Sequence, residues 1–545
     1  MPRPLYSPTV RRAAILLVLP LALTSPAPGA DAVSPVTPAE LGAHIRFLSD
    51  DLLEGRGPGT RGDRIAQAYV ETAFRAAGLA PAFGSSFRQE VPIRIATPDP
   101  KTTLGFVGAA GNESAGRFGD DFVLGFPRPE AAGQVSSEVV FAGYGIEAKE
   151  WDWDDFKGAD VKGKVLLLLS GEPGGDDPAL FGGKALTSHG RWRTKLEVAA
   201  RHGARGVLFV HTQEGAGYGW EVVRNGWPRP VASDPAIAAL DLEGWLSEPV
   251  GVRVAKAAGT TLGNLRAAAN RREFRPQALP LTLEARGLAK YETVVSANVA
   301  GLVRGKGPAD SAPLVVVSAH HDHLGIGTPE NGDAIYNGAM DNGPALAILL
   351  ALARRIGARA GELPVDVLFL APAAEEAGLL GSAKFVARPP VPLSRISACL
   401  NLEMSAVWGP ARDLVAIGAS ESALGTVFEA VAKREGLRIS PDTAPEQGFF
   451  YRSDQYSFAR AGVPGVWIDL GDDLVGTPPG TGFARREEYR AKRYHRPKDE
   501  FDPSWELTGT VQLARVVELA IEEIGARGGK VPWNAGSPRL GRGGP

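Results

Sequence analysis

The sequence of 545 residues is poor in cysteine, in net charge and in long apolar stretches. Its one cysteine, Cys399, excludes an intramolecular disulfide, and with no cysteine near the start we expect no bacterial lipid anchor. A formal net charge of −3 gives no reason to expect nucleic acid as a partner. After the start of the chain, no apolar run reaches the ~18 residues that a membrane helix needs, so we expect a soluble mature chain with no stable membrane anchor.

The start of the chain has the pattern of an export signal. A basic segment that ends in Arg11-Arg12 precedes the apolar run Ala13–Leu23, which is too short to span a bilayer. Ala30-Asp31-Ala32 then fits a cleavage site with small residues. We therefore predict that residues 1–32 are a signal peptide and that the protein is periplasmic or secreted. The arginine pair leaves a twin-arginine route open.

The composition, with 44% hydrophobic and 22% charged residues, is that of a globular protein long enough for two or more domains. Short apolar runs predict buried strands at 314–317, 365–371 and 398–402, and helical composition predicts helices at 38–48, 63–77, 345–356 and 505–524. This alternation of strands and helices is typical of an α/β fold. Between about 135 and 290 strand-like runs dominate instead, at 138–142, 165–169, 206–211 and 279–284.

Imidazole and carboxylate groups follow the predicted strands of the second half of the chain. In open α/β sheets, ligands bind at the carboxyl ends of the strands. Taken singly, each group has an ordinary explanation: a loop histidine is usually solvated, and Asp341 could cap the helix that follows. Taken together, the five groups form a mixed nitrogen and oxygen ligand set without thiolate, which suits zinc, with manganese or cobalt as alternatives. The five are His320, Asp341, Glu376, Glu403 and His495.

Six strings occur in one order between about Val294 and Gly525, and together they resemble one family of metallopeptidases. The strings are SAHHDHLG, YNGAMDNGPA, AAEEAGLLGS, NLEM, YRSDQYSFARAGVP and RYHRPKDEFD. The family is that of the di-zinc aminopeptidases, peptidase family M28, which also contains glutamate carboxypeptidase II and, more distantly, glutaminyl cyclases. The resemblance implies a mixed central sheet sandwiched by helices, the phosphorylase/hydrolase-like fold of zinc peptidases.

The resemblance also implies a role for each group. Two Zn2+ ions per chain would be held, one by His320 and Glu403 and the other by Glu376 and His495, with Asp341 as the bridge between them. Glu375 would be the general base. Asp322 would accept the far ring N–H of His320 and so orient that ring. The Asp341–Asn342 peptide bond would be cis.

Two positions depart from the family pattern. Residue 403 is Glu where most members carry Asp, and Pro344 stands where a small residue is more usual. The first change touches a metal ligand, and we predict that Glu403 still binds zinc, because its longer side chain can fold back through another rotamer. The second change is compatible with the start of a helix.

The resemblance also divides the chain into parts. Residues 33–134 and 291–527 would form the catalytic domain, with FLSDDLLEGRGPGTRG in its N-terminal part. Residues 135–290 resemble a protease-associated domain, a mostly-β domain that is commonly inserted into this fold and that either shapes substrate access or serves structure alone. Residues 528–545, rich in Gly and Pro, are predicted to be disordered.

The expected function is that of an exported zinc aminopeptidase acting on peptides or small proteins, and the sequence carries no signal of an oligomeric state. Arg452, Ser453 and Asp454 match a family segment that lies near the substrate. A carboxypeptidase of the glutamate carboxypeptidase type is the alternative, which needs arginines such as Arg452, Arg485 and Arg486 to converge. A binding protein without catalysis, as in transferrin receptors, is disfavoured because Glu375 and all five ligand positions carry competent groups.

Overall fold

The computed structural model describes Met1 and residues 34–109, 111–128, 133–175, 177, 179–226, 231–233, 240–404 and 407–537. Apart from Met1, the predicted signal peptide lies outside the described residues, as do residues 538–545 of the predicted tail. Among the described residues, no helix combines the length and the apolar character needed to cross a bilayer.

The larger sheet, here called the main sheet, is mixed, as predicted. Counted over the described residues it has ten strands, in the order β11 (Val231–Ser233), β2 (Arg88–Pro98), β14 (Ala289–Val303), β18 (Asp366–Ala371), β15 (Leu314–Ser318), β19 (Ile396–Leu402), β22 (Gly465–Leu470), β20 (Asp413–Ile417) and β21 (Arg438–Ser440), with β1 (Ala80–Pro81) beside β14. The four central strands from β18 to β22 are parallel to one another, and β14 and β20 flank them antiparallel. The predicted strands at 314–317, 365–371 and 398–402 are β15, β18 and β19.

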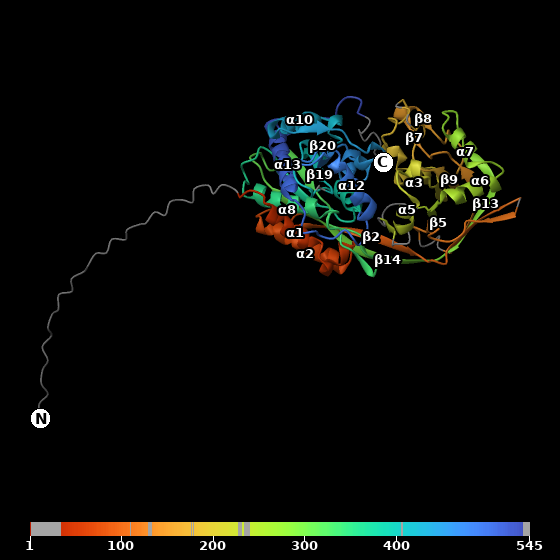
Figure 1. Ribbon diagram of the computed structural model, residues 1–545, viewed down its shortest axis with the longest axis horizontal. Coiled ribbons are helices and arrows are strands. Elements are labelled where there is room, and N and C mark those ends of the chain that lie inside the picture. The colour runs from red at the N-terminus through yellow and green to blue at the C-terminus, as the bar shows by residue number, and fades with distance from the viewer. Residues whose placement is uncertain are drawn as a thin grey trace. The chain divides into compact units, whose positions relative to one another are not determined.

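Helices cover both faces of the main sheet (Figure 1). Side chains of a strand alternate between faces, so Val315 and Val317 pack on one side of β15 and Leu314 and Val316 on the other. The first side is covered by α1 (Pro38–Leu48), α2 (Arg61–Ala76), α8 (Gly343–Gly357), α10 (Leu424–Glu435) and α13 (Thr508–Ala526). The second side is covered by α9 (Leu380–Ala387) and α11 (Gln455–Arg460), while α12 (Thr481–Lys492) is mostly exposed.

Local signals account for where the predicted helices begin. Thr37 caps α1, because its hydroxyl oxygen accepts the backbone N–H of Glu40 at 3.2 Å, and Pro38 occupies the first helical position. Pro344 stands likewise in the first turn of α8. The predicted helix at 38–48 coincides with α1, and the other three predicted helices match α2, α8 and α13 with small differences at their ends.

Residues 103–287 build a second sheet. Counted over the described residues it has eight strands, in the order β4 (Gly111–Ser114), β3 (Thr103–Gly108), β13 (Gln277–Gly287), β6 (Gly133–Phe141), β9 (Val165–Leu169), β10 (Gly206–Val210), β12 (Leu242–Leu246) and β5 (Phe122–Gly125). The helices α6 (Glu248–Ala257) and α7 (Leu262–Ala269) pack on one face and α3 (Trp192–Arg201) on the other. Shorter elements of this region are β7 (Glu147–Ala148), β8 (Trp153–Asp154), α4 (Gln213–Ala216) and α5 (Trp220–Gly226).

The boundary predicted for the inserted region is wrong at its start. The N-terminal part of the catalytic domain was predicted to extend to residue 134 and so to include residues 103–125. In the structure, β3, β4 and β5 of this segment belong to the second sheet. The cause is long-range pairing: β3 pairs with β13, at the far end of this region of the chain, and β5 pairs with β12. Conversely, β11 lies within the inserted range but pairs with β2 of the main sheet. The composition of a strand does not indicate its partner.

The start of the predicted tail is ordered. Within 528–537, Val531 is buried in the core beside α13, and the indole N–H of Trp533 donates to the carbonyl of Gly462 at 2.9 Å. These two apolar side chains anchor a segment whose Gly and Pro content alone predicted disorder. The prediction is therefore wrong for residues 528–537.

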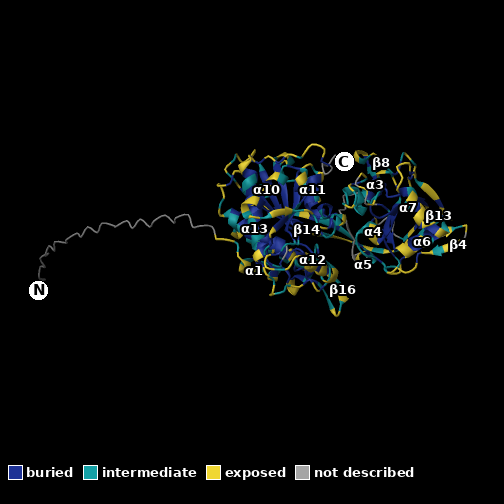
Figure 2. Cartoon of the chain, turned by 45° about the horizontal axis from the view of Figure 1, so that its top comes forward, coloured by how far each residue is buried: buried dark blue, intermediate teal, exposed yellow. Residues whose placement is uncertain are grey.

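The order of strands in the main sheet creates a crevice. The chain leaves β15 for β18 on one side and next returns to β19 on the other side. The helices that make these two connections, α8 and α9, lie on opposite faces of the sheet. The loops therefore diverge at the carboxyl end of β15, which is where open α/β sheets bind ligands. Figure 2 shows these central strands buried.

Candidate metal centre

Four of the predicted ligands approach one another at this crevice, and the fifth reaches them from a distant loop. His320 follows β15, Glu376 follows β18 and Glu403 follows β19 directly. Asp341 precedes α8, and His495 lies in the loop after α12. The parallel register of β18, β15 and β19 places their carboxyl ends at one edge of the sheet, so residues distant in sequence meet there.

The first group of side chains surrounds His320. Its Nε2 lies 3.0 Å from Oε1 of Glu403 and 3.4 Å from Oδ1 of Asp341. The ligand atoms of these three buried residues all lie within 4.8 Å of one another, close enough to share one metal ion. The predicted approach of Glu403 to this group is therefore present, despite its extra methylene.

The second group surrounds Glu376. Nε2 of His495 lies 3.1 Å from Oε2 of Glu376 and 3.4 Å from Oδ2 of Asp341. Asp341 thus turns one carboxylate oxygen toward each group, the arrangement expected of a bridging ligand. The Asp341–Asn342 peptide bond is cis, as predicted.

His323 joins the second group, although sequence reasoning did not assign it a role. It is fully buried, and its Nδ1 lies 2.8 Å from Oε1 of Glu376. His323, Asp341 and Glu376 bring their ligand atoms within 4.8 Å of one another. The signal was present in SAHHDHLG, which holds three histidines close together, but the spacing does not indicate which of their rings face the crevice.

The chemistry of these side chains fits bound cations. Among the described residues, Oε1 of Glu376, both ring nitrogens of His323 and Nε2 of His495 are buried atoms without a hydrogen-bond partner. Opposing groups nevertheless lie within 3.4 Å of the Glu376 oxygen, of Nδ1 of His323 and of Nε2 of His495. Buried polar atoms without partners are costly, whereas atoms directed at a shared metal ion need no hydrogen bonds. Imidazole and carboxylate donors without thiolate match zinc.

The electrostatics of the centre show how strongly the groups depend on one another. Burial alone would lower the pKa of His320, but the carboxylates of Glu403 and Asp341 raise it well above its usual value. In the same way, Glu376 and Asp341 raise the pKa of His495 to about 9 against the effect of burial. The carboxylates therefore concentrate negative charge at the centre, which favours protonated histidines or bound cations there.

Asp322 lies beside the centre, but its contact differs from the predicted one. The Nδ1–H of His320 donates to the backbone carbonyl of Asp322 at 3.1 Å, whereas the Asp322 carboxylate is 3.9 Å away. That carboxylate instead accepts the backbone N–H groups of Glu375 and Glu376, at 3.0 and 3.3 Å. The loop between Asp322 and the strand end thus brings the carbonyl, rather than the carboxylate, against the ring, and Asp322 positions the Glu375-Glu376 pair.

Asp499 positions Asp341 in the same way, through hydrogen bonds to the backbone. It is fully buried and accepts the backbone N–H groups of Met340 and Asp341, and the Tyr489 hydroxyl donates to it at 3.0 Å. Gly338, shortly before Asp341, has φ +59°, and a Cβ there would lie 2.5 Å from the His323 ring. A glycine is therefore required for this close packing.

Arg56 is a further residue that the sequence analysis did not single out, although it lies in the quoted string GRGPGT. Its side chain is 1% exposed and crosses from the N-terminal segment to the loops of the centre. The guanidinium donates only to backbone carbonyls: those of His321, Leu48, Asn337, Gly338 and Asp341. It therefore fixes the backbone on both sides of the crevice, which makes it a positioning residue.

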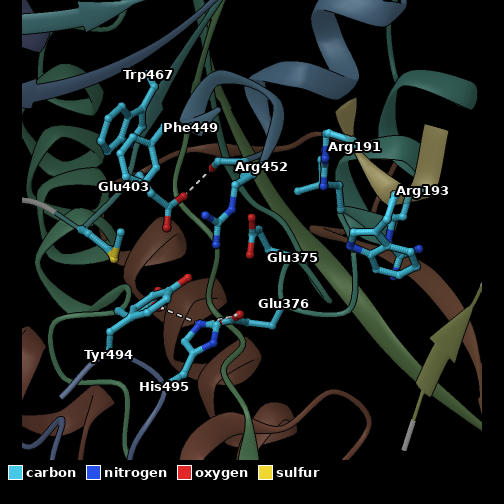
Figure 3. Close-up of a pocket in the computed structure, with 16 residues that line it drawn as sticks. Arg191, Arg193, Glu375, Glu376, Glu403, Phe449, Arg452, Trp467, Tyr494 and His495 are labelled. Carbon is cyan, nitrogen blue, oxygen red and sulfur yellow. Dashed lines mark hydrogen bonds and ion pairs between the residues drawn. The ribbon is translucent and has the colours of Figure 1, made fainter. Parts of the chain in front are cut away.

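A cavity of about 190 Å³ opens onto the centre (Figure 3). Glu375, the predicted general base, is 8% exposed and lines it together with Asp341, Glu376, Glu403 and His495. The rest of the lining consists of Arg191, Trp192, Arg193, Gly378, Leu379, Met404, Phe449, Arg452, Ser453, Trp467 and Tyr494. Burial and the neighbouring Glu403 and Glu376 carboxylates raise the pKa of Glu375 well above its usual value, against the effect of His320.

The three predicted substrate-binding residues have different surroundings. Arg452 lines the cavity, and Ser453 lines it while donating its hydroxyl to Glu403. Asp454 is fully buried and is not part of the lining, so the structure does not bring it to the cavity as a substrate contact would require. It begins the turn into α11, whose first residues are packed against the sheet.

The arginines considered for a carboxypeptidase do not converge. Arg486 is held by Asp469 and Asp472 at 2.9 and 3.0 Å, away from the cavity, and Arg485 is exposed on α12. Instead, Arg191 and Arg193, which belong to the region of the second sheet, join Arg452 in the lining. Sequence position gave no indication of this meeting, because the two segments lie far apart in the chain.

Fold and site together define an α/β protein with a carboxylate–imidazole centre at the carboxyl edge of a mixed sheet. Residues 298–518 match the model of peptidase family M28, and this part of the chain is an M28 peptidase domain. A comparison with curated proteins gave no match.

One solved structure shares the fold, and others are similar to this chain at lower scores. An aminopeptidase from Aneurinibacillus sp. strain AM-1 is 20% identical, with a TM-score of 0.51 over 89% of this chain and 92% of that one. A zinc aminopeptidase from Bacillus subtilis is 18% identical, with a TM-score of 0.42 over 93% and 98% of the two chains. A peptidase M28 precursor from Shewanella amazonensis SB2B is 16% identical, with a TM-score of 0.41 over 90% and 95%.

Proposed function

We propose that the protein is an exported metallopeptidase with two zinc ions that releases residues from the N-terminus of peptides. One observation carries the proposal: Asp341 faces two carboxylate–imidazole groups at once, and Glu375 stands beside them in the cavity wall. His320 and Glu403 would hold one ion, and Glu376 and His495 the other. His323 is within reach of the second.

When bound, a pair of zinc ions would supply Lewis acidity to an attacking water and to the scissile carbonyl. Glu375 would take the proton of that water and deliver it to the leaving amine. Its carboxyl is suited to the task because its backbone N–H is fixed by Asp322, and because Glu376, its neighbour, belongs to the metal centre. Bound cations would balance the Glu403 and Glu376 charges that now raise the Glu375 pKa.

Glu403 favours aminopeptidase action. It lines the cavity beside the metal centre, where its oxygens lie close to His320 and to the Ser453 hydroxyl. An anionic group there would attract the free amine of a substrate. The predicted leader at residues 1–32 supports export.

The test compares three forms of one tetrapeptide: free at both ends, acetylated at its N-terminus, and amidated at its C-terminus. The purified protein is assayed as isolated, after dialysis against a chelator, and after zinc is restored, with metal content measured each time. We expect about two zinc ions per chain, with hydrolysis of the free and amidated peptides alone, lost on chelation and regained with zinc.

Other results select other functions. Hydrolysis of the acetylated but not the amidated peptide would identify a carboxypeptidase. Metal binding without hydrolysis of any form would favour a binding protein on this scaffold. Hydrolysis that persists at zero metal content would overturn the proposal.

A further inference from the structure

Three arginines line the same cavity as the metal centre, and they come from two separate parts of the chain. Arg191 and Arg193 flank Trp192 at the start of α3, in the region of the second sheet, whereas Arg452 precedes α11. Figure 3 shows Arg191 and Arg193 beyond Glu375, on the side away from Tyr494, with Arg452 nearer to Glu403. Carboxylates thus line one end of the cavity, and Arg191 and Arg193 line the other, here called the arginine-rich end, with Arg452 between the two.

No ion pair neutralises the arginine-rich end. Within the part of the chain that the structure describes, Arg191, Arg193 and Arg452 form no ion pair, and the guanidinium groups of Arg191 and Arg452 donate no hydrogen bond. Arg191 lies over the Tyr456 ring at 5.6 Å, and Arg452 lies over Phe449 at 6.0 Å. Arg193 donates to the carbonyl of Ala377 at 2.6 Å, which fixes it against the loop after Glu376.

Two other largely buried arginines of the molecule form ion pairs, unlike the three in the cavity wall. Arg486 is held between two aspartates, and Arg355 contacts Glu518 at 2.9 Å. Burial lowers the pKa of Arg191 to about 10, and the nearby charges of Arg193 and Arg452 act in the same direction. Three like charges gathered in a partly buried wall are unfavourable unless an anion joins them.

The carboxylates of the cavity do not pair with these arginines. Asp341, Glu376 and Glu403 face the histidines of the metal centre, and Glu375 forms no ion pair with the three arginines in the described part of the chain. A guanidinium group presents two parallel N–H donors that match a carboxylate. The cavity of about 190 Å³ is smaller than the ~300 Å³ and more of pockets for larger ligands, so a group bound at its arginine end belongs to a residue close to the scissile bond.

We propose that Arg191, Arg193 and Arg452 form an anion subsite that selects substrates bearing a carboxylate within about one residue of the scissile bond. The carboxylate is either the side chain of an acidic residue or the free C-terminus of a dipeptide. This inference rests on the proposed peptidase function. It assigns the region of the second sheet a direct part in substrate selection, through the segment from Arg191 to Arg193.

The test uses pairs of peptides that differ by one carboxylate. Glu-Ala-Ala-amide is compared with Gln-Ala-Ala-amide, Ala-Glu-Ala-amide with Ala-Gln-Ala-amide, and Leu-Ala with Leu-Ala-amide. We expect kcat/KM to favour the charged member of at least one pair by about tenfold or more, since charge-assisted pairing is strong. The pair that shows the preference identifies the source of the carboxylate.

Variants show whether the arginines cause the preference. Arg191→Gln and Arg452→Gln should reduce the ratio within that pair toward one, and Arg191→Lys should restore part of it. Arg485→Gln, an exposed arginine outside the cavity, is the matched control and should keep the wild-type ratio. Metal content and circular dichroism are measured for each variant, so that loss of folding is distinguished from loss of the subsite.

A binding measurement separates this inference from the proposed function. Glutarate, a dicarboxylate, should bind the wild-type protein in calorimetry, whereas its diamide should not, and Arg191→Gln should weaken glutarate binding about tenfold. Turnover without any preference within the three pairs overturns the anion subsite and leaves the peptidase intact. Absence of turnover with glutarate binding that depends on Arg191 overturns the peptidase and leaves the subsite intact.

Discussion

Both sheets bury charged side chains, but they satisfy them differently. In the region of the second sheet, Asp155 accepts the backbone N–H groups of Tyr144 and Ile146 and the indole N–H of Trp153. Lys195 is 1% exposed and donates to the carbonyls of Leu169 and Gly171. These charges have the partners that burial demands, and their role is structural.

At the edge of the main sheet the partners are missing. Glu376, His323 and His495 have buried atoms without hydrogen bonds in the described part of the chain, and Arg452 forms no ion pair there. Burial of a charge therefore does not by itself identify a functional site. An incomplete set of partners does, because a folded protein tolerates it where a ligand completes the set.

Among the variants, replacement of Glu375, the proposed general base, should have the largest effect. Glu375→Gln keeps the shape of the side chain and leaves the ligands untouched, so metal content should stay at the wild-type value. Turnover should fall by roughly 10²–10⁴, because only proton transfer is lost. Rates and metal content are measured on the same preparation, and near-normal turnover at full metal content would show that Glu375 is not the base.

Replacing Glu403, a proposed ligand, should weaken metal binding at one of the two proposed sites. In Glu403→Ala, the ion on the His320 side should bind about 100-fold more weakly or be lost, while the ion held by Glu376 and His495 remains. Titration with zinc, followed by metal analysis, measures both sites. Glu403→Asp is the matched control and should keep two ions, and two ions of unchanged affinity in Glu403→Ala would exclude Glu403 as a ligand.

Replacing Arg56 tests whether a buried charge with hydrogen-bond partners stabilises the loops beside the metal centre. Arg56→Met removes a donor from five backbone carbonyls and should lower the free energy of unfolding by about 3 kcal/mol, because buried acceptors lose their partner. Urea denaturation measures the loss. Arg61→Met, at an exposed position, should change stability by no more than about 0.5 kcal/mol. Equal stability of the two variants would contradict the positioning role.

Replacing Lys195 should have the smallest effect, because it should alter stability but not turnover. It therefore contrasts with the variants at the metal centre. Burial lowers the pKa of Lys195 from 10.5 to about 7, with Glu172 and Asp155 opposing the shift. Between these values the unfolded chain binds the extra proton, so the stability that this residue confers rises with pH. Relative to Lys195→Met, the wild-type protein should therefore gain stability from pH 7 toward pH 10.

Chemical denaturation at several pH values measures that difference, and Lys195→Arg, which stays charged throughout, is the control that should show no gain. A wild-type advantage that falls over this range would mean that Lys195 is charged and paired in the folded protein. Metal content and turnover of Lys195→Met should equal those of the wild-type protein, and a loss of metal would show that α3 supports the metal centre, for example through the contact of Arg193 with Ala377.

The local elements and the ligand chemistry could be predicted from the sequence alone. Apolar runs marked β15, β18 and β19 because buried parallel strands need apolar side chains on both faces, and caps such as Thr37 and Pro38 marked where α1 begins. The groups that follow those strands, from His320 to Glu403, were predictable because parallel strands end at a common edge. In the folded chain His320, Glu376 and Glu403 lie at that edge, each beside Asp341 or a histidine of the centre.

Which further groups complete the site depends on how distant parts of the chain pack together. His320 and His323 are both histidines of the string SAHHDHLG. The conformation of the loop after β15 decides that His323 is the one whose ring faces Glu376. The partner of β3 and the meeting of Arg191 with Arg452 depend on contacts between distant parts of the chain. Such contacts leave no local pattern, because the residues that make them are chosen by the packing of whole elements and not by their neighbours in the chain.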